Sequence, residues 1–335
     1  MKMKKTTIFL ITASILCATT GVSFAVSEPQ YDEQNALIYI NKEAATDYLL
    51  SCQNPDGGIG LHPGEESGLP GTCHALLGLE VLKAVDEIDK ESCTEYIIGL
   101  QNPDGGFSCS LSSSPDESDL KDTCLAALSL WVLDELDRMN EVACINYITQ
   151  CQNPNGGFGF HPGEGSNMMA TGMATWALDA LGELWLMDED SCIDFIASCQ
   201  DLRGGFRPNP LIPITNVMGT SMAVLSLERL DRLDIVEGDL CVNFIASLQQ
   251  EEGDFLFASQ PMPMMENTVP KSAITYGALV CLKMLDGLDE IDLEASIPYI
   301  IHCQNPDGGF GGSPEAGSDS RDTAHAVMTL YELPP

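Results

Sequence analysis

Two of the five histidines in this chain occupy the same position in two copies of a repeated segment, and both stand near residues that bind zinc in other proteins. His74 follows Cys73, and His325 lies three residues after Asp322. Imidazole, thiolate and carboxylate groups are all zinc ligands, so these side chains could hold a metal ion if the fold brought them together. The triplet Asp122-Thr123-Cys124 offers the same residue types in a third copy. We favour ordinary core or rim positions over a metal site as the explanation of these residues.

The repeated segment occurs six times along the chain. Each copy contains a loop related to QNPDGGFG that opens with a glutamine, and successive glutamines are 48 to 55 residues apart. They are Gln53, Gln101, Gln152, Gln200, Gln249 and Gln304. The glycines predict a turn that needs positive φ, and we expect the Gln and the Phe to hold the loop against the next unit. We favour a structural turn over a site of chemistry.

Apolar periodicity predicts one helix before each loop and one after it. The stretch before the loop, such as CTEYIIGL, has apolar residues at i, i+3, i+4 and i+7. After the loop, a Thr or Ser precedes small residues and then leucines at positions seven and ten, all on one helix face. Helix pairs of this kind must stack to bury that face. Because the first and last units keep the same apolar columns, we expect a closed ring: an all-α, α6/α6 toroid with twelve helices in two concentric layers.

The first 25 residues differ from the rest of the chain. Three lysines precede an apolar run that ends in Ser23-Phe24-Ala25, the pattern of a secretory signal peptide. We therefore expect a signal peptide (1–25), a linker (26–37) and a toroid domain (38–335) that is exported as a secreted, periplasmic or cell-surface protein. An uncleaved N-terminal membrane anchor is the alternative. We expect no membrane span in the mature chain.

Charge and cysteine content narrow the possible functions further. The formal net charge is -35, which repels phosphate backbones and argues against a nucleic-acid partner. Thirteen cysteines in an exported chain would permit disulfides. However, most of them share repeat columns with Ala, Ser or Leu, and equivalent residues of packed helices lie too far apart for a disulfide. We therefore expect buried thiols.

The QNPDGGFG loop, followed by the helix DTAHAVMTL of the last unit, resembles the repeats of the protein prenyltransferase β subunits and the squalene cyclases. The resemblance covers about residues 38–333. It implies an α/α toroid whose central cavity holds an isoprenoid chain. The residues of the second helices that would line such a cavity are Trp131, Trp176, Tyr276, Met173 and Met222. Plain core packing is the alternative for most of them.

The resemblance also implies a zinc site, which this chain keeps only in part. The prenyltransferases hold zinc with Asp-x-Cys in the fifth unit and His in the sixth. His325 matches that histidine, but Lys271 and Ala273 stand at the Asp and Cys positions. The usual zinc site is therefore incomplete, and the sequence leaves open whether the chain is an enzyme.

A zinc site displaced by one unit is a hypothesis that the same residues allow. Advancing the family geometry pairs Asp322 with His74, with Cys73 or His325 as a third ligand. Asp122 and Cys124 are alternates.

Three functions remain possible from the sequence. The first is a prenyltransferase-like protein that binds or transfers an isoprenoid or a similar apolar ligand. The second is a non-catalytic exported toroid that binds a protein or an envelope component through its loop face. The third is a terpene cyclase-like enzyme, which the lack of an Asp-x-Asp-Asp motif disfavours. Prenyltransferase activity would also imply an α-subunit partner.

Overall fold

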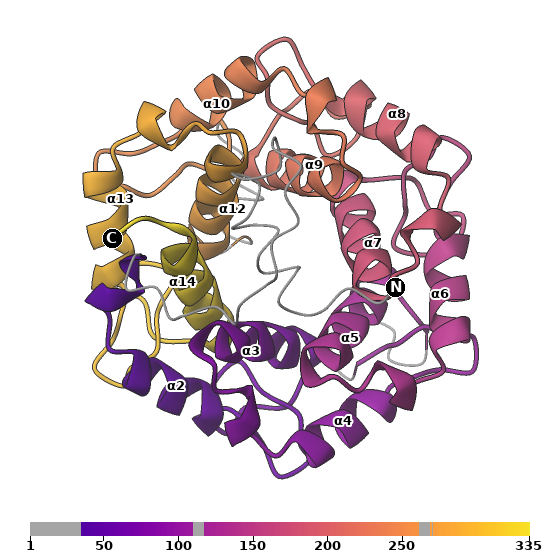
Figure 1. Cartoon of the computed structure of the whole chain (residues 1–335), viewed down its shortest axis with the longest axis vertical. Coiled ribbons are helices and arrows are strands. Elements are labelled where there is room, and N and C mark those ends of the chain that lie inside the picture. The colour runs from indigo at the N-terminus through magenta and orange to yellow at the C-terminus, as the bar shows by residue number, and fades with distance from the viewer. Residues whose placement is uncertain (1–34, 110–116, 261–268, 270) are drawn as a thin grey trace, which may run out of the picture.

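The computed structural model describes residues 35–109, 117–260, 269 and 271–335. In this part of the chain, twelve α-helices alternate between an outer and an inner layer of a closed ring (Figure 1). The outer helices are α2 (Lys42–Ser51), α4 (Lys90–Ile98), α6 (Glu141–Gln150), α8 (Glu189–Cys199), α10 (Gly238–Ala246) and α13 (Leu293–His302). The inner helices are α3 (Leu69–Leu82), α5 (Leu120–Leu133), α7 (Met168–Ala180), α9 (Val217–Arg229), α12 (Lys271–Met284) and α14 (Ser320–Glu332). The all-α toroid predicted from the repeat is confirmed.

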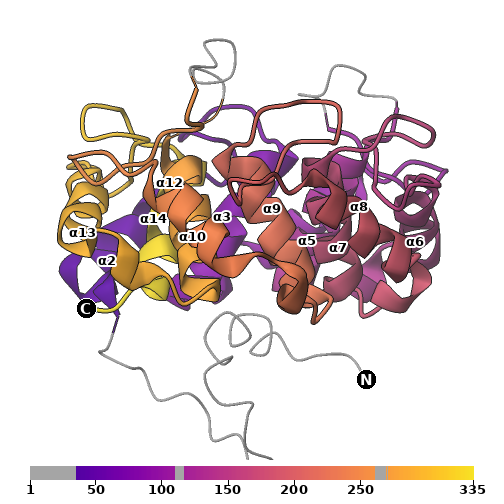
Figure 2. The same ribbon diagram turned by 90° about the horizontal axis from the view of Figure 1, so that it is seen from above.

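Short 3-10 turns complete the described chain. One, η2 (Ala36–Tyr39), precedes the first outer helix. The others follow inner helices: η3 (Val85–Glu87), η4 (Leu136–Arg138), η5 (Leu184–Leu186), η6 (Leu233–Ile235) and η7 (Leu288–Glu290). Because each inner helix begins after a long loop and ends at a short turn, the loops gather at one end of the ring, and the C-terminus lies at the other (Figure 2).

Side-chain caps begin most of these helices. The oxygen of Asp119, for example, accepts a hydrogen bond from the backbone N–H of Asp122 at the start of α5. Such a cap satisfies a backbone donor that has no partner inside the helix. Asn41, Asp89, Asn140, Asp188, Asp292, Asn167, Asn216 and Asp319 act in the same way.

Each loop glutamine joins its unit to the following one. At the closure of the ring, Gln304 Nε2 donates to the carbonyl oxygen of Asn41 and its Oε1 accepts from the Asn41 N–H, both at 3.0 Å. Equivalent pairs are Gln53 with Asp89, Gln101 with Asn140, Gln152 with Asp188 and Gln249 with Asp292. The predicted role of the glutamine is confirmed.

The glycine of the same loop makes this contact possible. Gly308 has φ +91°, and a Cβ atom there would lie 2.2 Å from the carbonyl oxygen of Ala44 in the first outer helix. Only glycine tolerates both the backbone angle and the close approach.

The backbone of the loop aromatic residue is bound within its own unit. Phe107 is fully buried, and its N–H donates to Thr123 Oγ1 (2.9 Å) at the start of the following inner helix. The threonine hydroxyl in turn donates to the carbonyl oxygen of Asp119 (2.6 Å). The same bond to the loop N–H is made by Thr72, Thr171, Thr220 and Thr323. The threonine column thus joins loop to helix within these five units.

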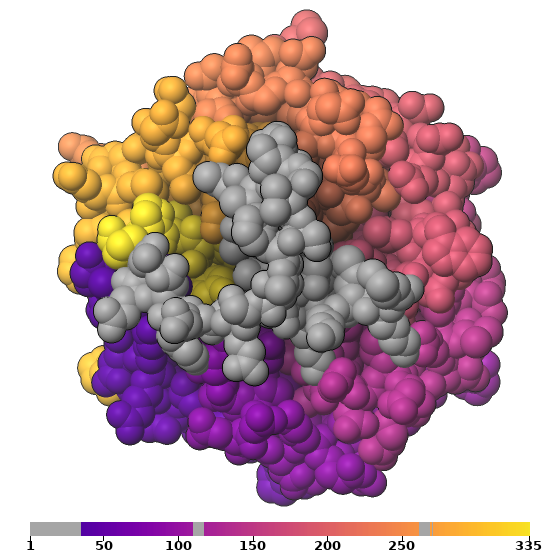
Figure 3. Space-filling model, viewed as in Figure 1, coloured from indigo at the N-terminus to yellow at the C-terminus, as the bar shows by residue number. Residues whose placement is uncertain are grey.

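The first and last units meet directly. Helix α14 packs against α3, and the backbone of Ser320 donates to the carbonyl oxygen of Leu61 (2.8 Å). At the other end of the ring, Ala36 N donates to Leu333 O (3.0 Å). Figure 3 shows the last unit lying against the first. Ala36 and Leu37 are buried, so the fold begins slightly before the predicted boundary at residue 38.

The twelve cysteines of the described residues are all buried and form no disulfide with one another, as the repeat columns predicted. None of the described helices is long and apolar enough to cross a membrane. The predicted signal peptide and most of the linker lie outside the described residues.

Candidate functional site

The regular pattern of the repeat changes at the start of α12. Ser272 stands in the column that threonine occupies in the other five units. Its hydroxyl points to the next inner helix, where it donates to Asp322 Oδ1 and lies 3.2 Å from His325 Nδ1. In the other units, the hydroxyl at this position binds the loop of its own unit. In the fifth unit, it joins units five and six through polar side chains.

Three rings meet beside this serine. The ring of His325 stacks on Tyr276 of α12, with centroids 5.6 Å apart and an interplanar angle of 20°. It also meets His74 of α3 edge to face, at 5.0 Å and 85°. Because α12, α14 and α3 are successive inner helices, rings from all three can meet only on the side that faces the centre of the ring. We call Ser272, Tyr276, Asp322, His325 and His74 the polar cluster.

Hydrogen bonds fix the proton positions on both imidazoles. His74 Nδ1 lies 2.7 Å from the carbonyl oxygen of Pro70, which can only accept, so this nitrogen carries the proton. The single hydroxyl hydrogen of Ser272 goes to Asp322, so His325 Nδ1 must be the donor toward Ser272. In the neutral rings, both Nε2 atoms are therefore hydrogen-bond acceptors.

Burial determines the charge of the cluster. It lowers the pKa of His325 well below the ordinary value, with the neighbouring His74 adding to the effect. The pKa of His74 is lowered as well, again mainly by burial. Burial and the nearby Asp319 carboxylate raise the pKa of Asp322 to about 6. Near neutral pH, the two imidazoles are neutral acceptors.

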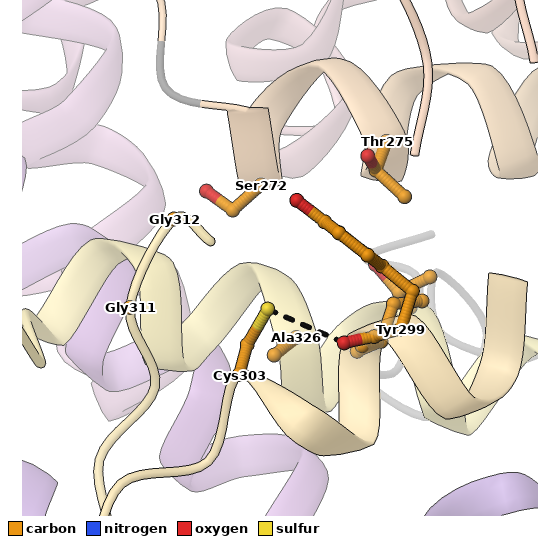
Figure 4. Close-up of a pocket in the computed structure, with 9 residues that line it drawn as sticks. Ser272, Thr275, Tyr299, Cys303, Gly311, Gly312 and Ala326 are labelled. Atoms are coloured by element: carbon orange, nitrogen blue, oxygen red, sulfur yellow. Dashed lines mark hydrogen bonds between the residues drawn. The ribbon is translucent and has the colours of Figure 1, made fainter. Parts of the chain in front are cut away.

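A small cavity lies behind the cluster, between α12, α13 and α14. It has a volume of about 20 Å³, enough for one water molecule. The Tyr299 hydroxyl points into it toward Ser272 (Figure 4). Within the described residues, neither the Tyr299 hydroxyl nor Thr275 Oγ1 has a hydrogen-bond partner, although both are buried. In two other units the equivalent tyrosines, Tyr48 and Tyr147, donate to the carbonyl oxygens of Ser318 and Ser118.

The residues at the family's zinc positions do not fit a zinc ion. Lys271 Nζ pairs with Asp254 Oδ2 at 2.9 Å, and Ala273 has no donor atom. A cation and a methyl group cannot replace a carboxylate and a thiolate as ligands. We therefore derive no step through zinc at these positions.

The structure brings together only some of the residues proposed for the displaced zinc site. His74 and His325 lie together, and Asp322 is joined to His325 through Ser272. Cys73 is instead buried beside Ser129 of α5. In the described part of the chain, no three His, Cys, Asp or Glu side chains are grouped so as to hold a metal ion. Zinc binding stays a prediction, which elemental analysis of the purified chain can test.

The alternate ligands lie on α5, apart from the polar cluster. Asp122 Oδ2 accepts from the backbone N–H of Cys109 (3.0 Å), and its Oδ1 is 3.7 Å from Lys121 Nζ. Cys124 is fully buried, and burial raises the pKa of its thiol well above the ordinary value. A protonated thiol in the core is a packing group.

The residues predicted to line the centre differ in how far they are covered. Met173, Trp176, Met222 and Tyr276 are half-buried, whereas Trp131 is only 6% exposed. Each inner helix is flanked by two inner neighbours and backed by the outer layer, so its remaining exposed surface faces the centre of the ring. The exposed apolar surface there belongs mainly to α7, α9 and α12.

The family model for the prenyltransferase alpha-alpha toroid domain matches residues 22–175 and 165–333. The chain belongs to this family. No curated protein sequence matches the chain. The toroid family is therefore established by the family model and by the fold.

Solved structures of similar fold include three of different kinds. The Candida albicans protein geranylgeranyltransferase-I complexed with GGPP has a TM-score of 0.67 and 17% identity, covering 87% of this chain and 90% of that one. The type II terpene cyclase MstE from Scytonema, as the R337A variant with geranylgeranyl dihydroxybenzoate, has a TM-score of 0.61 and 14% identity, covering 89% and 97%. A protein from Actinoplanes has a TM-score of 0.57 and 11% identity, covering 89% and 99%. At these identities the similarity establishes the fold alone.

Sequence reasoning found both histidines of the polar cluster but missed Ser272, Thr275 and Tyr299. The signal for Thr275 was present, because the equivalent position is alanine in the other five units. The serine in a threonine column is a subtler change, and Tyr299 belongs to an aromatic column in which tyrosine is the commonest residue, so it does not stand out.

Proposed function

We propose that this chain binds an isoprenoid or a similar long apolar molecule in the centre of its ring. The observation that carries the proposal is the half-buried apolar surface of Met173, Trp176, Met222 and Tyr276. Methionine adapts its shape to a flexible apolar ligand, and aromatic rings add large contact surfaces. Two proteins of the same fold are named with geranylgeranyl molecules, which supports an isoprenoid as the ligand.

We propose binding of an isoprenoid, and not its transfer, for this chain. The residues at the family's zinc positions give no support to zinc-dependent transfer, because Lys271 is paired with Asp254 and Ala273 lacks a ligand atom. We also propose that the mature chain acts outside the cytoplasm, on the basis of the signal-like residues 1–25.

Tryptophan fluorescence can test the proposed binding directly. The probe is geranylgeranyl methyl ether, which has the apolar chain but neither charge nor hydroxyl. We expect a saturable change in emission with about one molecule bound per chain. Trp176→Phe should remove most of this change. Trp185→Phe is the matched control, because Trp185 lies on η5 outside the ring centre and is 73% exposed.

A second variant tests whether the ligand occupies the centre. Met173→Trp adds volume to the half-buried surface and should weaken binding while leaving thermal unfolding close to that of the parent chain. A signal that persists unchanged in Trp176→Phe and Met173→Trp would place the ligand elsewhere. The absence of any saturable signal would refute the proposal.

A protein-binding role through the loop face is the second candidate. It is favoured by Leu202 and Leu211, which are almost fully exposed in the loops of the fourth unit. Exposed leucines of this kind are typical of interaction sites when they cluster. Two results together would favour this role: none of the apolar probes binds, and a protein partner no longer binds after Leu202→Ser and Leu211→Ser.

A further inference from the structure

The inner helices carry five basic side chains, and every one is paired with a carboxylate. Lys121 lies beside Asp122, Lys271 beside Asp254, and Lys283 beside Glu332. Arg321 Nη2 contacts Asp319 Oδ2 at 3.0 Å. Arg229 Nε is 3.8 Å from Asp179 Oδ2 and its guanidinium lies over the ring of Trp176. A polyanionic group entering the ring would therefore meet cations that are already neutralised.

The polar cluster offers neutral hydrogen-bond acceptors instead of cations. The proton positions derived above leave His74 Nε2 and His325 Nε2 as acceptors, on the part of each imidazole that lies away from its Nδ1 hydrogen bond. His74 is the more exposed of the two rings, since His325 is only 7% exposed. His74 and His325 are the sixth residues of their helices, so both lie in the half of the helix nearer the loop end of the ring. An acceptor pair at this place suits a neutral group that donates a hydrogen bond.

We propose that the head group of the bound molecule is a neutral hydrogen-bond donor, such as the hydroxyl of an isoprenoid alcohol, and not a diphosphate. In this arrangement, the hydroxyl donates to the Nε2 atom of His74 or His325. The apolar chain then lies across the ring centre, along Tyr276, Trp176 and Met222. The proposal rests on the proposed function, because it names the ligand class for the same site.

The hydrogen-bonded pair Ser272 and Asp322 has a defined part in this site. Ser272 Oγ accepts a hydrogen bond from His325 Nδ1, and its hydroxyl donates a hydrogen bond to Asp322 Oδ1. The chain of bonds holds the ring of His325 in the orientation and the tautomer that leave Nε2 without a proton. Ser272 and Asp322 are therefore positioning residues for the acceptor.

Three probes with the same C20 chain separate the possibilities: geranylgeraniol, geranylgeranyl methyl ether and geranylgeranyl diphosphate. Titration calorimetry on the purified protein should show the alcohol binding about tenfold more tightly than the ether, the effect of one additional hydrogen bond. The diphosphate should bind more weakly than the alcohol. The double variant His74→Phe/His325→Phe keeps both aromatic rings but removes both acceptors, so it should bring the alcohol-to-ether ratio close to one while affinity for the ether is retained.

The control is His302→Phe, which changes an exposed histidine at the end of the outer helix α13 and should leave the ratio unchanged. Equal affinities for alcohol and ether in the parent chain, or tightest binding of the diphosphate, would overturn the head-group proposal while leaving the proposed function intact. If none of the three probes binds, the proposed function fails and this inference fails with it.

Discussion

Ser272 Oγ lies 3.2 Å from His325 Nδ1 and joins the last two inner helices at the place where the threonine column of the repeat is interrupted. In the other five units the hydroxyl at this position binds its own loop. The polar cluster thus arises from a single change of residue type together with the histidines of the sixth and first units. The ring closes at the same place, since α14 packs against α3.

Removing this hydroxyl should change the protonation pattern of His325. In Ser272→Ala, His325 Nδ1 loses the acceptor that holds its proton, so we expect a mixture of the two neutral tautomers. Nitrogen-15 NMR of the imidazole rings measures this mixture. Thr329→Ala is the control, because the Thr329 hydroxyl donates to the backbone oxygen of His325 and not to its ring. An unchanged tautomer in Ser272→Ala would contradict the positioning role.

The buried carboxyl of Asp322 should make stability depend on pH. Its pKa is raised from 3.8 to about 6, so the folded chain holds this proton more tightly than the unfolded chain. The contribution of Asp322 to the free energy of unfolding should therefore fall as the pH rises from about 4 to about 6, whereas the lowered pKa values of His74 and His325 act in the opposite direction. The contribution is about 3 kcal/mol, because one pKa unit is worth about 1.4 kcal/mol.

Asp322→Asn isolates this contribution, since the amide cannot ionise. Near pH 4 the protonated acid and the amide should give similar stabilities. At pH 7 to 8 the variant should be the more stable, by about 3 kcal/mol. Urea unfolding of both chains across this range measures the difference. A difference that does not change with pH would show that Asp322 ionises normally in the folded chain.

The loop glycine at the ring closure should be intolerant of a side chain. Gly308→Ala combines an unfavourable φ with a Cβ atom 2.2 Å from the Ala44 carbonyl oxygen. We expect a loss of more than about 3 kcal/mol, or a ring that no longer closes. Gly317→Ala, in the same unit but with no atom within 4 Å of its Cβ position, should change stability by less than about 0.5 kcal/mol. Comparable losses in both variants would contradict the close-approach argument.

Thr275 should lower the free energy of unfolding relative to an alanine at the same position. Its buried hydroxyl has no hydrogen-bond partner in the described chain, and alanine occupies the equivalent position in the other units. Thr275→Ala should raise the free energy of unfolding by up to about 1 kcal/mol. Thermal unfolding measures this, with Thr123→Ala as a comparison that should lose stability, because that hydroxyl makes two buried hydrogen bonds. A loss in Thr275→Ala would mean that the hydroxyl is satisfied by a bound water.

Most of the fold could be predicted from the sequence because the repeat presents the same evidence six times. The helix pairs, the closure of the ring and the glutamine contacts all follow from columns that agree with one another. The buried cysteines follow in the same way, since their columns accept alanine or leucine in other units. The start of the fold was placed slightly late, because the segment around Ala36 lies outside the repeat and its contact with Leu333 is long-range.

The candidate site could be predicted only in part. His74 and His325 were visible because histidine replaces leucine, methionine or isoleucine in one column. Cys73 was grouped with His74 because the two are adjacent in sequence, but successive residues of a helix point in directions about 100° apart. One therefore packs toward α5 while the other faces the centre of the ring. The direction of the Ser272 hydroxyl depends on how α12 lies against α14, which residue types do not reveal.

The most direct measurement of the central claim is a crystal structure of the protein grown with geranylgeraniol. We expect one elongated molecule in the centre of the ring, with its chain against Met173, Trp176 and Met222 and its oxygen within hydrogen-bonding distance of His74 or His325 Nε2. A ring centre free of ligand at saturating concentration, or a molecule bound only on the outer helices or loops, would contradict it.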